Sequence, residues 1–422
     1  MQETRQNIIL SLIGLMFFLA SCDQGKTLDE LRTHVYITKV VEKSERPFPG
    51  GQLVPAGIRQ QIEASKTLRE VFPVTRFIRL EATGHSLLGN ITGVAYSGNS
   101  WFVSENTRQL VYQFDDDGTF IRVVGARGKG PGEYGDVYRI GMCYGNLLGI
   151  QARSGIFLFD EGGRFIKKIS LRTDEYHVVS SSGFIWKRPE RLYLANFASH
   201  NPEAPWHAVV DPSAEKLRIV AGFGERINFV EKATLRGAAR WNYTSFARVG
   251  DRIWTGSPYE GRVEVFDLDG RYAGELGRKH PEQLTLKDFE GVDMAKEGQI
   301  GPLYFDKFRN AGIIAVGDLA VASLFGKGHF SHDIFDRNGN LLCAGITAAV
   351  PYALLHTGHE NLLVGSLHLL DSPATYERIL TEGEMTLLYA AGWDPATYLD
   401  DNPYLVVGRS IAAPRDPADT GP

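Results

Sequence analysis

The sequence predicts an all-β fold, a six-bladed β-propeller of four-stranded antiparallel blades, because two turn patterns recur along the chain. The first is a Gly followed by a polar residue between short apolar runs, which suits a two-residue hairpin. It occurs at Gly98-Asn99, Gly145-Asn146, Gly250-Asp251, Gly317-Asp318 and Gly358-His359. The second pattern is an aromatic residue, an Asp that can close its own turn, and a nearby Gly that can supply positive φ. It occurs in residues 113–120, 158–165, 265–272 and 334–341.

The two patterns keep step with each other. The separations from the first Gly to the second are 118 − 98 = 20, 162 − 145 = 17, 270 − 250 = 20 and 339 − 317 = 22 residues. A degenerate copy lies at Pro189 and residues 209–215. Each unit is therefore interpreted as four short strands with one hairpin between the first two and another between the last two. Units of about 40 to 50 residues with four strands are typical of propeller blades.

The ends of the repeat region predict a sixth blade and the way the ring closes. Three strands are expected near the C-terminus, over residues 352–356, 361–365 and 402–410. The apolar segment 76–81 is a strand without a neighbour of its own. As the fourth strand of the last blade it would leave no free edge where the ring closes.

The N-terminus predicts export and a lipid anchor. Residues 8–20 form an apolar run of 13 behind Arg5, which is the length of a signal-peptide core and too short to span a bilayer. Leu19-Ala20-Ser21-Cys22 follows and resembles the bacterial lipobox, in which the cysteine becomes acylated. We therefore expect a signal peptide over 1–21, a membrane anchor at Cys22 and a tether over 22–74, with a short helix near 57–71. The propeller would span 75–410, and a disordered tail would follow over 411–422.

Residues 125–137, GARGKGPGEYGDV, carry a more specific resemblance. Together with the strand, FDxxG turn and strand before it, this segment is similar to the six-bladed propeller lipoproteins of Bacteroidetes-type bacteria, which are related to NHL-repeat propellers. The similarity extends over about residues 75–410, and the third blade departs from it. It implies a cell-envelope location, in the outer membrane on its periplasmic side or at the cell surface rather than in the inner membrane.

The composition and one glycine motif exclude several classes of partner and binding site. The net charge is −5 and the pI is about 6.2, so no basic surface is expected for nucleic acid. Three cysteines are too few for a disulfide scaffold. The segment 130–135 matches G-x-G-x-x-G, but a strand rather than a helix is expected after it, so we interpret it as a crossover between blades and not as a dinucleotide site.

One face of the ring is predicted to carry function. The two hairpins of each blade emerge on one face, whereas the loops between the second and third strands and the links between blades emerge on the other. The longer segments all fall on this second face, and long segments of this kind often bind ligands. They are residues 125–138, 196–207, 222–243, 277–310, 323–332 and 367–401. Candidate ligand-binding residues there are Glu105, Asn106, Arg108, Arg153, Asn196, Tyr259, Glu260, Lys327 and His329.

We favour a binding module for an unknown small molecule, glycan or envelope protein, because no nucleophile elbow or defined metal-ligand spacing is found. No cofactor is predicted. The alternative is a metal-dependent hydrolase or lyase acting on a lactone or sugar. Some six-bladed propeller lactonases bind calcium at the axis, and this resemblance makes Glu105, Asn106 and Asn196 weak candidates for calcium ligands.

Overall fold

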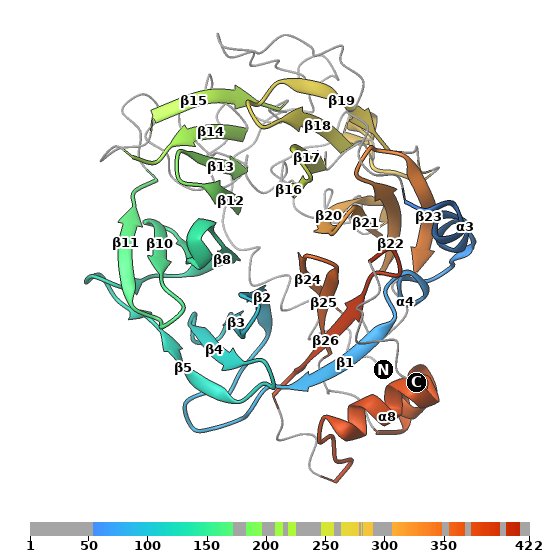
Figure 1. Ribbon diagram of the computed structural model, residues 1–422, viewed down its shortest axis with the longest axis horizontal. Helices are drawn as coiled ribbons and strands as arrows, with labels where there is room; N and C mark the ends of the chain where they lie inside the picture. Colours follow the sequence, from blue (N-terminus) through green and yellow to red (C-terminus); the bar gives the residue numbers. More distant parts are fainter. Residues whose placement is uncertain are drawn as a thin grey trace.

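The computed structural model is a ring of six four-stranded antiparallel sheets, which confirms the predicted six-bladed β-propeller (Figure 1). It describes residues 54–171, 183–195, 207–213, 218–224, 246–256, 263–277, 280, 282–289, 306–347, 354–367, 373–396 and 402–413. Within these ranges no helix has the length and apolar character needed to cross a membrane.

Each blade takes its strands in chain order from the axis outward, except the last. The first three blades are β2 (Ile91–Tyr96), β3 (Ser100–Glu105), β4 (Val111–Asp115) and β5 (Phe120–Val124); β8 (Val137–Met142), β9 (Leu148–Ala152), β10 (Gly155–Phe159) and β11 (Phe165–Ile169); β12 (Gly183–Arg188), β13 (Arg191–Ala195), β14 (His207–Asp211) and β15 (Arg218–Phe223). The next two are β16 (Phe246–Val249), β17 (Arg252–Gly256), β18 (Val263–Asp267) and β19 (Tyr272–Leu276); β20 (Arg309–Val316), β21 (Leu319–Gly326), β22 (His329–Asp336) and β23 (Leu341–Thr347). Blade 6 is β24 (Leu354–His359), β25 (Leu362–Leu367), β26 (Tyr404–Arg409) and, at its outer edge, β1 (Val74–Arg79).

The middle strands of the blades are apolar because neighbouring blades cover both of their faces. All five residues of β9 and all five of β10 are buried, whereas three of the five residues of the outer strand β11 are exposed. Trp101 and Trp254 occupy the second strands of blades 1 and 4 and are fully buried. A strand buried on both faces has no polar–apolar alternation, which is why the turns predict this fold better than the strand pattern does.

The aspartate turns form as predicted. Asp115, Asp267 and Asp336 each accept hydrogen bonds through Oδ1 from the backbone N–H groups two and four residues later. The Gly three residues after each Asp has a φ of 90°, 82° and 88° in turn, so a side chain there would be strained. The first turn pattern predicts four of its five hairpins. The fifth is wrong: Gly358 lies in β24, where a Cβ would come within 1.8 Å of the Ala315 carbonyl oxygen, and the turn follows at Glu360.

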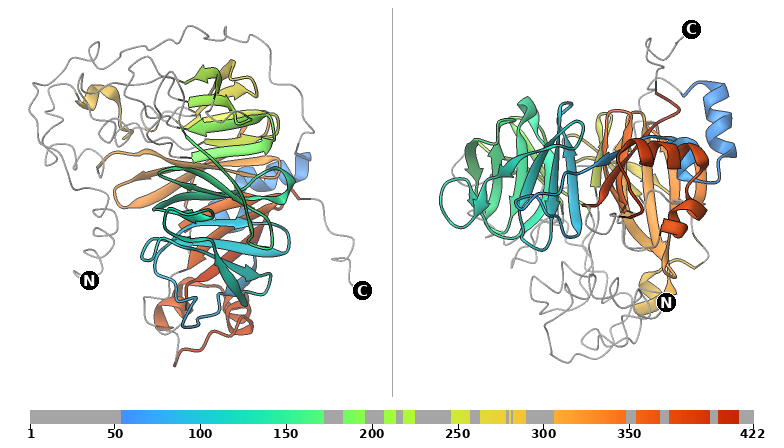
Figure 2. Two further views of the ribbon diagram at one scale, coloured as in Figure 1. Left: turned by 90° about the vertical axis from the view of Figure 1, so that its left-hand side faces the viewer. Right: turned by 90° about the horizontal axis from the view of Figure 1, so that it is seen from below.

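Helices at both ends of the chain pack on the outside of the ring (Figure 2). They are α3 (Ala56–Ala64), α4 (Leu68–Val71), α7 (Pro373–Ile379) and α8 (Glu382–Ala390), with 3-10 turns η1 (Tyr144–Asn146) and η2 (Leu286–Phe289) elsewhere. Ile62, Leu68 and Phe72 have no exposed surface and join the core cluster of blades 5 and 6. The Thr347 N–H at the edge of β23 donates to the Lys66 carbonyl. Residues 56–72, predicted as part of a tether with a short helix, thus form two helices docked on blade 5.

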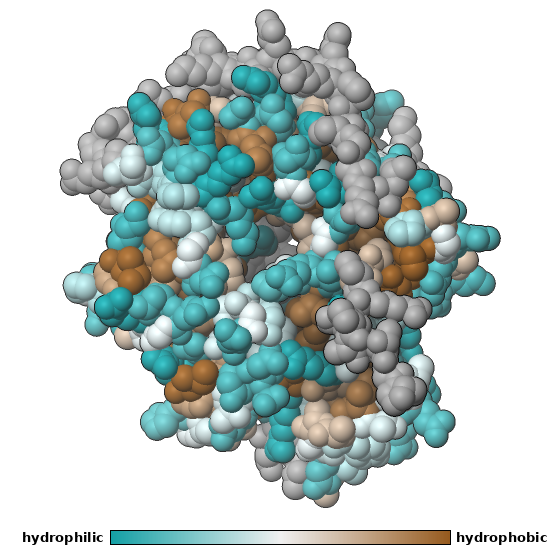
Figure 3. All heavy atoms as spheres, in the orientation of Figure 1, coloured by the Kyte–Doolittle hydropathy of each residue, from teal (hydrophilic) through white to brown (hydrophobic). Residues whose placement is uncertain are grey.

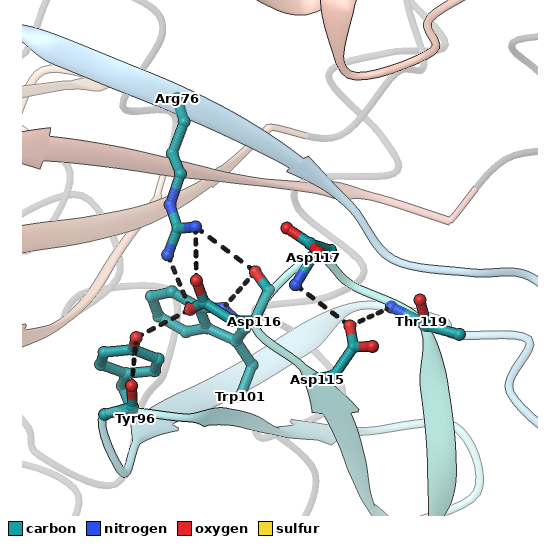
Figure 4. A network of polar contacts seen from close by, with 8 residues as sticks. Arg76, Tyr96, Trp101, Asp115, Asp116, Asp117 and Thr119 are labelled. Atoms are coloured by element: carbon teal, nitrogen blue, oxygen red, sulfur yellow. Dashed lines mark hydrogen bonds and ion pairs between the residues drawn. The ribbon is translucent and has the colours of Figure 1, made fainter.

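The ring closes where β1 pairs with β26, as predicted for segment 76–81. A second contact joins this outer strand of blade 6 to the aspartate turn of blade 1 (Figure 4). Arg76 donates from both Nη atoms to the Asp116 carboxylate at 2.8 Å, and Tyr96 Oη donates to the same carboxylate at 2.7 Å. Trp101 Nε1 donates to the Asp116 carbonyl at 3.2 Å. Burial and the hydrogen bond to Asp116 raise the pKa of Tyr96 to about 12, so its hydroxyl remains a donor at neutral pH. We call Arg76, Tyr96 and Asp116 the closure clasp.

We predict that Asp116→Asn destabilises the protein by about 1 kcal/mol at neutral pH, because it removes a paired charge that water partly screens. Asp117→Asn, in the same turn and outside the clasp, is the control. Arg76 lowers the pKa of Asp116, so this stabilisation is complete above the unfolded carboxyl pKa of about 4 and is lost as the pH falls through the folded value. Denaturant unfolding from pH 7 to pH 3 should show the two variants converging. Equal stability of D116N and D117N at pH 7 would contradict the role of the clasp.

Candidate functional site

The two faces of the ring differ in the connections they carry. On the hairpin face, short turns join the first and second strands of each blade, and short connections join the third and fourth strands of every blade except blade 6, whose fourth strand is β1. Figure 3 views this face, which is largely hydrophilic and hollowed at the centre of the ring. The opposite face, which we call the looped face, holds the strand ends joined by the long connections, such as Phe223 to Phe246 and Leu276 to Arg309.

The loop between β3 and β4 of blade 1 contains the first predicted site residues. Glu105 has no exposed surface, and its two carboxylate oxygens accept the backbone N–H groups of Thr107 at 2.6 Å and Arg108 at 2.7 Å. Asn106 donates its N–H to the Asn90 carbonyl. Glu105 therefore acts as an internal cap that holds the loop, and the Arg108 side chain is left at the exposed tip. Burial raises the pKa of the Tyr112 hydroxyl, and the nearby Arg108 guanidinium lowers it by a smaller amount.

The glycine-rich crossover 125–136 is built in the same way. The Glu133 carboxylate accepts N–H groups from Lys129 at 2.9 Å and Gly130 at 2.8 Å, and the Lys129 side chain is exposed at the tip. Two short parallel strands, β6 (Ala126–Arg127) and β7 (Glu133–Tyr134), close its base. A Cβ at Gly125, where φ is 70°, would lie 2.6 Å from the Tyr134 ring. The crossover between blades is thus as expected, and its glycines permit a tight fold around a partly buried acid and a buried tyrosine.

Polar contacts fasten the crossover to blade 1 and the β3–β4 loop to blade 2. The Tyr134 hydroxyl donates to the Val124 carbonyl and accepts the Val111 N–H at 3.2 Å. The Val137 N–H donates to Gln109 Oε1 at 2.9 Å, and Val137 is paired with Ala152, which directly precedes Arg153. The loop tips of blades 1 and 2 are therefore one connected surface, which we call the blade 1–2 platform. It brings Arg108 and Arg153, both exposed, onto the same part of the looped face.

The loop predicted in blade 5 is wrong. Residues 323–332 were predicted to be a long loop, but β21 and β22 continue through them and leave only Lys327 and Gly328 as a tight turn. Lys327 has a φ of 51° and forms an ion pair with Glu282, and the His329 ring packs edge-on against Phe308 at 5.1 Å. The reason is strand length: all four strands of this blade have seven or eight residues, so the blade extends further than the others.

The predicted site residues are thus divided among separate places. Glu105, Asn106, Arg108 and Arg153 lie on the blade 1–2 platform, and Lys327 and His329 lie at the tip of blade 5; among the described contacts none joins the two groups. Asn196, Tyr259, Glu260 and Cys22 lie outside the described residues. Sequence reasoning missed Lys129 and Tyr138, which stand on the same platform as Arg108. In the sequence, Lys129 is marked by its place at the charged tip of the glycine-rich crossover, and Tyr138 is marked as a tyrosine at the start of an innermost strand.

Glu105 and Asn106, the two expected calcium ligands that the structure describes, do not fit that role. Both oxygens of Glu105 are occupied by backbone N–H groups, and Asn106 Oδ1 accepts the Thr107 hydroxyl at 3.4 Å. Calcium needs six to eight oxygen ligands that are free to coordinate it. In the part of the chain that the structure describes, no group of three His, Cys, Asp or Glu residues is arranged to hold a metal ion.

Comparison with known proteins supports the fold. Residues 58–142 match the model of a family described as a 6-bladed beta-propeller. A protein of Bacteroides fragilis described as exported superposes with a TM-score of 0.61 at 13% identity, over 82% of this chain and 96% of its own. A member of the DUF4221 family from Bacteroides vulgatus superposes with a TM-score of 0.52 at 9% identity, over 80% and 97%. Regucalcin, a calcium-binding protein of Agrobacterium tumefaciens, reaches a TM-score of only 0.39 at 13% identity, over 82% and 97%. No curated protein matches the chain.

We predict that Glu105→Gln lowers the unfolding midpoint by the same amount in calcium and in a chelator. The substitution replaces one acceptor oxygen of the buried cap with an amide, which leaves a loop N–H without its partner at a cost of about 1 to 3 kcal/mol. Exposed Glu190→Gln is the control, with no expected change. Thermal melts of both variants and of the parent protein give the measurement. A calcium-dependent loss confined to E105Q would instead show that the carboxylate binds metal.

Proposed function

We propose that this protein is a lipid-anchored binding module of the cell envelope whose looped face recognises its ligand. The observation that carries the proposal is the asymmetry of the ring. The long connections between described strands join strand ends on one face, while the hairpin face has short turns, three of which are closed by their own aspartates. Closed rings with rigid strands and variable loops on one side are well suited to recognition, because loop changes leave the core intact.

The described side chains favour binding over catalysis. Glu105 and Glu133, two acids of the loops on blades 1 and 2, are engaged in backbone hydrogen bonds that hold the loops in place. His332 is buried in blade 5, where desolvation lowers its pKa to about 4 and Ser323 Oγ lies 2.9 Å from Nδ1. A general base that acts at neutral pH would need to be nearer the ligand-accessible surface and to have a higher pKa.

Export and anchoring are supported by the N-terminal sequence. The apolar segment 8–20 and the lipobox-like Leu19-Ala20-Ser21-Cys22 point to acylation of Cys22. The similarity to a Bacteroides fragilis protein described as exported agrees with this location. Several acyl chains on one residue give stable anchoring, whereas a single chain gives marginal binding.

We expect Cys22→Ser to abolish incorporation of labelled palmitate and to move the protein from the membrane fraction to the soluble fraction. The thiol is the acylation site, and serine cannot replace it in a thioether-linked anchor. Cys143→Ser and Cys343→Ser are the controls, because both of these cysteines are buried in the propeller. Palmitate labelling that persists in C22S would refute the anchor.

The role of the looped face is tested by photo-crosslinking in living cells. A diazirine amino acid replaces Arg153 on the looped face of blade 2 or Arg164 on the hairpin face of the same blade. Both side chains are exposed, and Arg164 is 79% exposed, so each probe should be tolerated. We expect discrete adducts from position 153 and none from position 164. Adducts from position 164 alone, equal adducts from both positions, or none from either would overturn the proposal.

A further inference from the structure

We infer that the blade 1–2 platform binds a carboxylated glycan, meaning a polysaccharide that contains uronic acids. The inference rests on the proposed function and names the ligand class for part of the looped face. It is based on the way two neighbouring loops separate their charges, and on an exposed aromatic ring beside them.

The formal charges of the platform nearly cancel, but the basic side chains are exposed whereas two of the three acids are buried or partly buried. Arg108, Arg127, Lys129 and Arg153 supply four positive charges, and Glu105, Glu133 and Asp136 supply three negative ones. All four basic side chains are exposed. Glu105 is fully buried and Glu133 is partly buried. Each carboxylate accepts hydrogen bonds from two backbone N–H groups of its own loop. Asp136 is the one exposed acid of the set, 3.6 Å from Arg127. The outer layer is therefore basic, although the whole chain has a net charge of −5.

The loop architecture holds these cations in place before a ligand arrives. Each acid cap fixes the backbone at the residue that bears a cation, Arg108 in one loop and Lys129 in the other. The Gln109 contact to Val137 joins the loop of blade 1 to blade 2, and the Tyr134 contacts to Val111 and Val124 join the crossover to blade 1. Preorganised backbone lowers the entropy cost of binding, and arginine can grip a carboxylate through two parallel hydrogen bonds.

The platform also carries an exposed aromatic side chain, Tyr138. It lies near the looped end of β8, the innermost strand of blade 2, and its side chain is 44% exposed. An aromatic side chain with a polar hydroxyl suits contact with the apolar face of a sugar ring while its edge stays wet. Tyr138 directly follows Val137, which bonds Gln109 next to Arg108 and pairs with Ala152 next to Arg153. A sugar ring on the tyrosine would thus bring its carboxylates toward the two arginine-bearing loops. A membrane surface would also attract the cations, so anionic vesicles form a separate arm of the test.

The experiment uses the full chain in detergent and measures the Kd for polygalacturonate oligomers, for neutral galactan oligomers and for vesicles containing phosphatidylglycerol. The test variant is Arg108→Gln with Arg153→Gln. The matched control is Arg164→Gln with Arg218→Gln, which removes the same charge from the exposed hairpin face of blades 2 and 3. Tyr138→Ala is compared with Tyr389→Ala, since Tyr389 on α8 is 48% exposed. Thermal melts verify that each variant is folded.

We expect polygalacturonate to bind and galactan to bind at least tenfold more weakly. The Arg108/Arg153 variant should raise the Kd for polygalacturonate at least tenfold and weaken its salt dependence, and Y138A should raise the Kd severalfold. Neither control should change it by more than twofold. The inference is overturned if polygalacturonate does not bind, if it binds no better than galactan, if the controls weaken binding equally, or if only the vesicles bind. Photo-crosslinked adducts at position 153 without polygalacturonate binding would sink this inference and leave the binding module standing.

Discussion

Closure of the ring is the constraint on which the rest of this structure depends. A blade has its middle strands buried on both faces only when another blade stands on each side, so an open ring would expose two apolar sheet faces. The protein closes the ring by pairing β1, from the start of the propeller, with β26, from its end. Arg76 then carries the contact across the seam to Asp116 in blade 1. Contacts more than 300 residues apart in sequence thus determine whether the local blades are stable.

The closed ring explains how the two faces could diverge. Hairpin turns on one face are completed locally, by an aspartate that accepts its own backbone N–H groups and a glycine with positive φ. Connections on the other face are under no such local constraint, and two of the described ones use an acid as a cap for their own backbone. Glu105 and Glu133 illustrate this: two carboxylates that would pass for ligand-binding groups stabilise loops, and basic residues occupy the tips. The charged side chains exposed on this platform are consequently mostly basic, with Asp136 as the acidic exception.

The helices outside the ring show a second use of the chain ends. Ile62, Leu68 and Phe72 join a core cluster with Tyr376, Leu388 and Trp393 from α7, α8 and the turn after them. The N-terminal segment also covers the outer edge of blade 5 through the Thr347 contact to Lys66. An uncovered outer strand would offer unpaired N–H and C=O groups to another chain, so this packing protects an edge as well as burying apolar surface.

The sequence by itself determined the number of blades, the place of the closing strand and the division into a hairpin face and a looped face. Turn chemistry is local: an Asp, a Gly and the spacing between them specify a reversal wherever they occur, as at 113–120 and 334–341. Only the tertiary structure decided what the polar residues of the looped face do. The sequence predicts Glu105 and Asn106 as ligand donors, but in the structure they form hydrogen bonds within their own loop. Lys327 and His329 lie on a strand hairpin and contact neighbouring residues. The role of a side chain depends on which groups it contacts in the folded protein. Those contacts are determined by the packing of segments that lie far apart in the sequence.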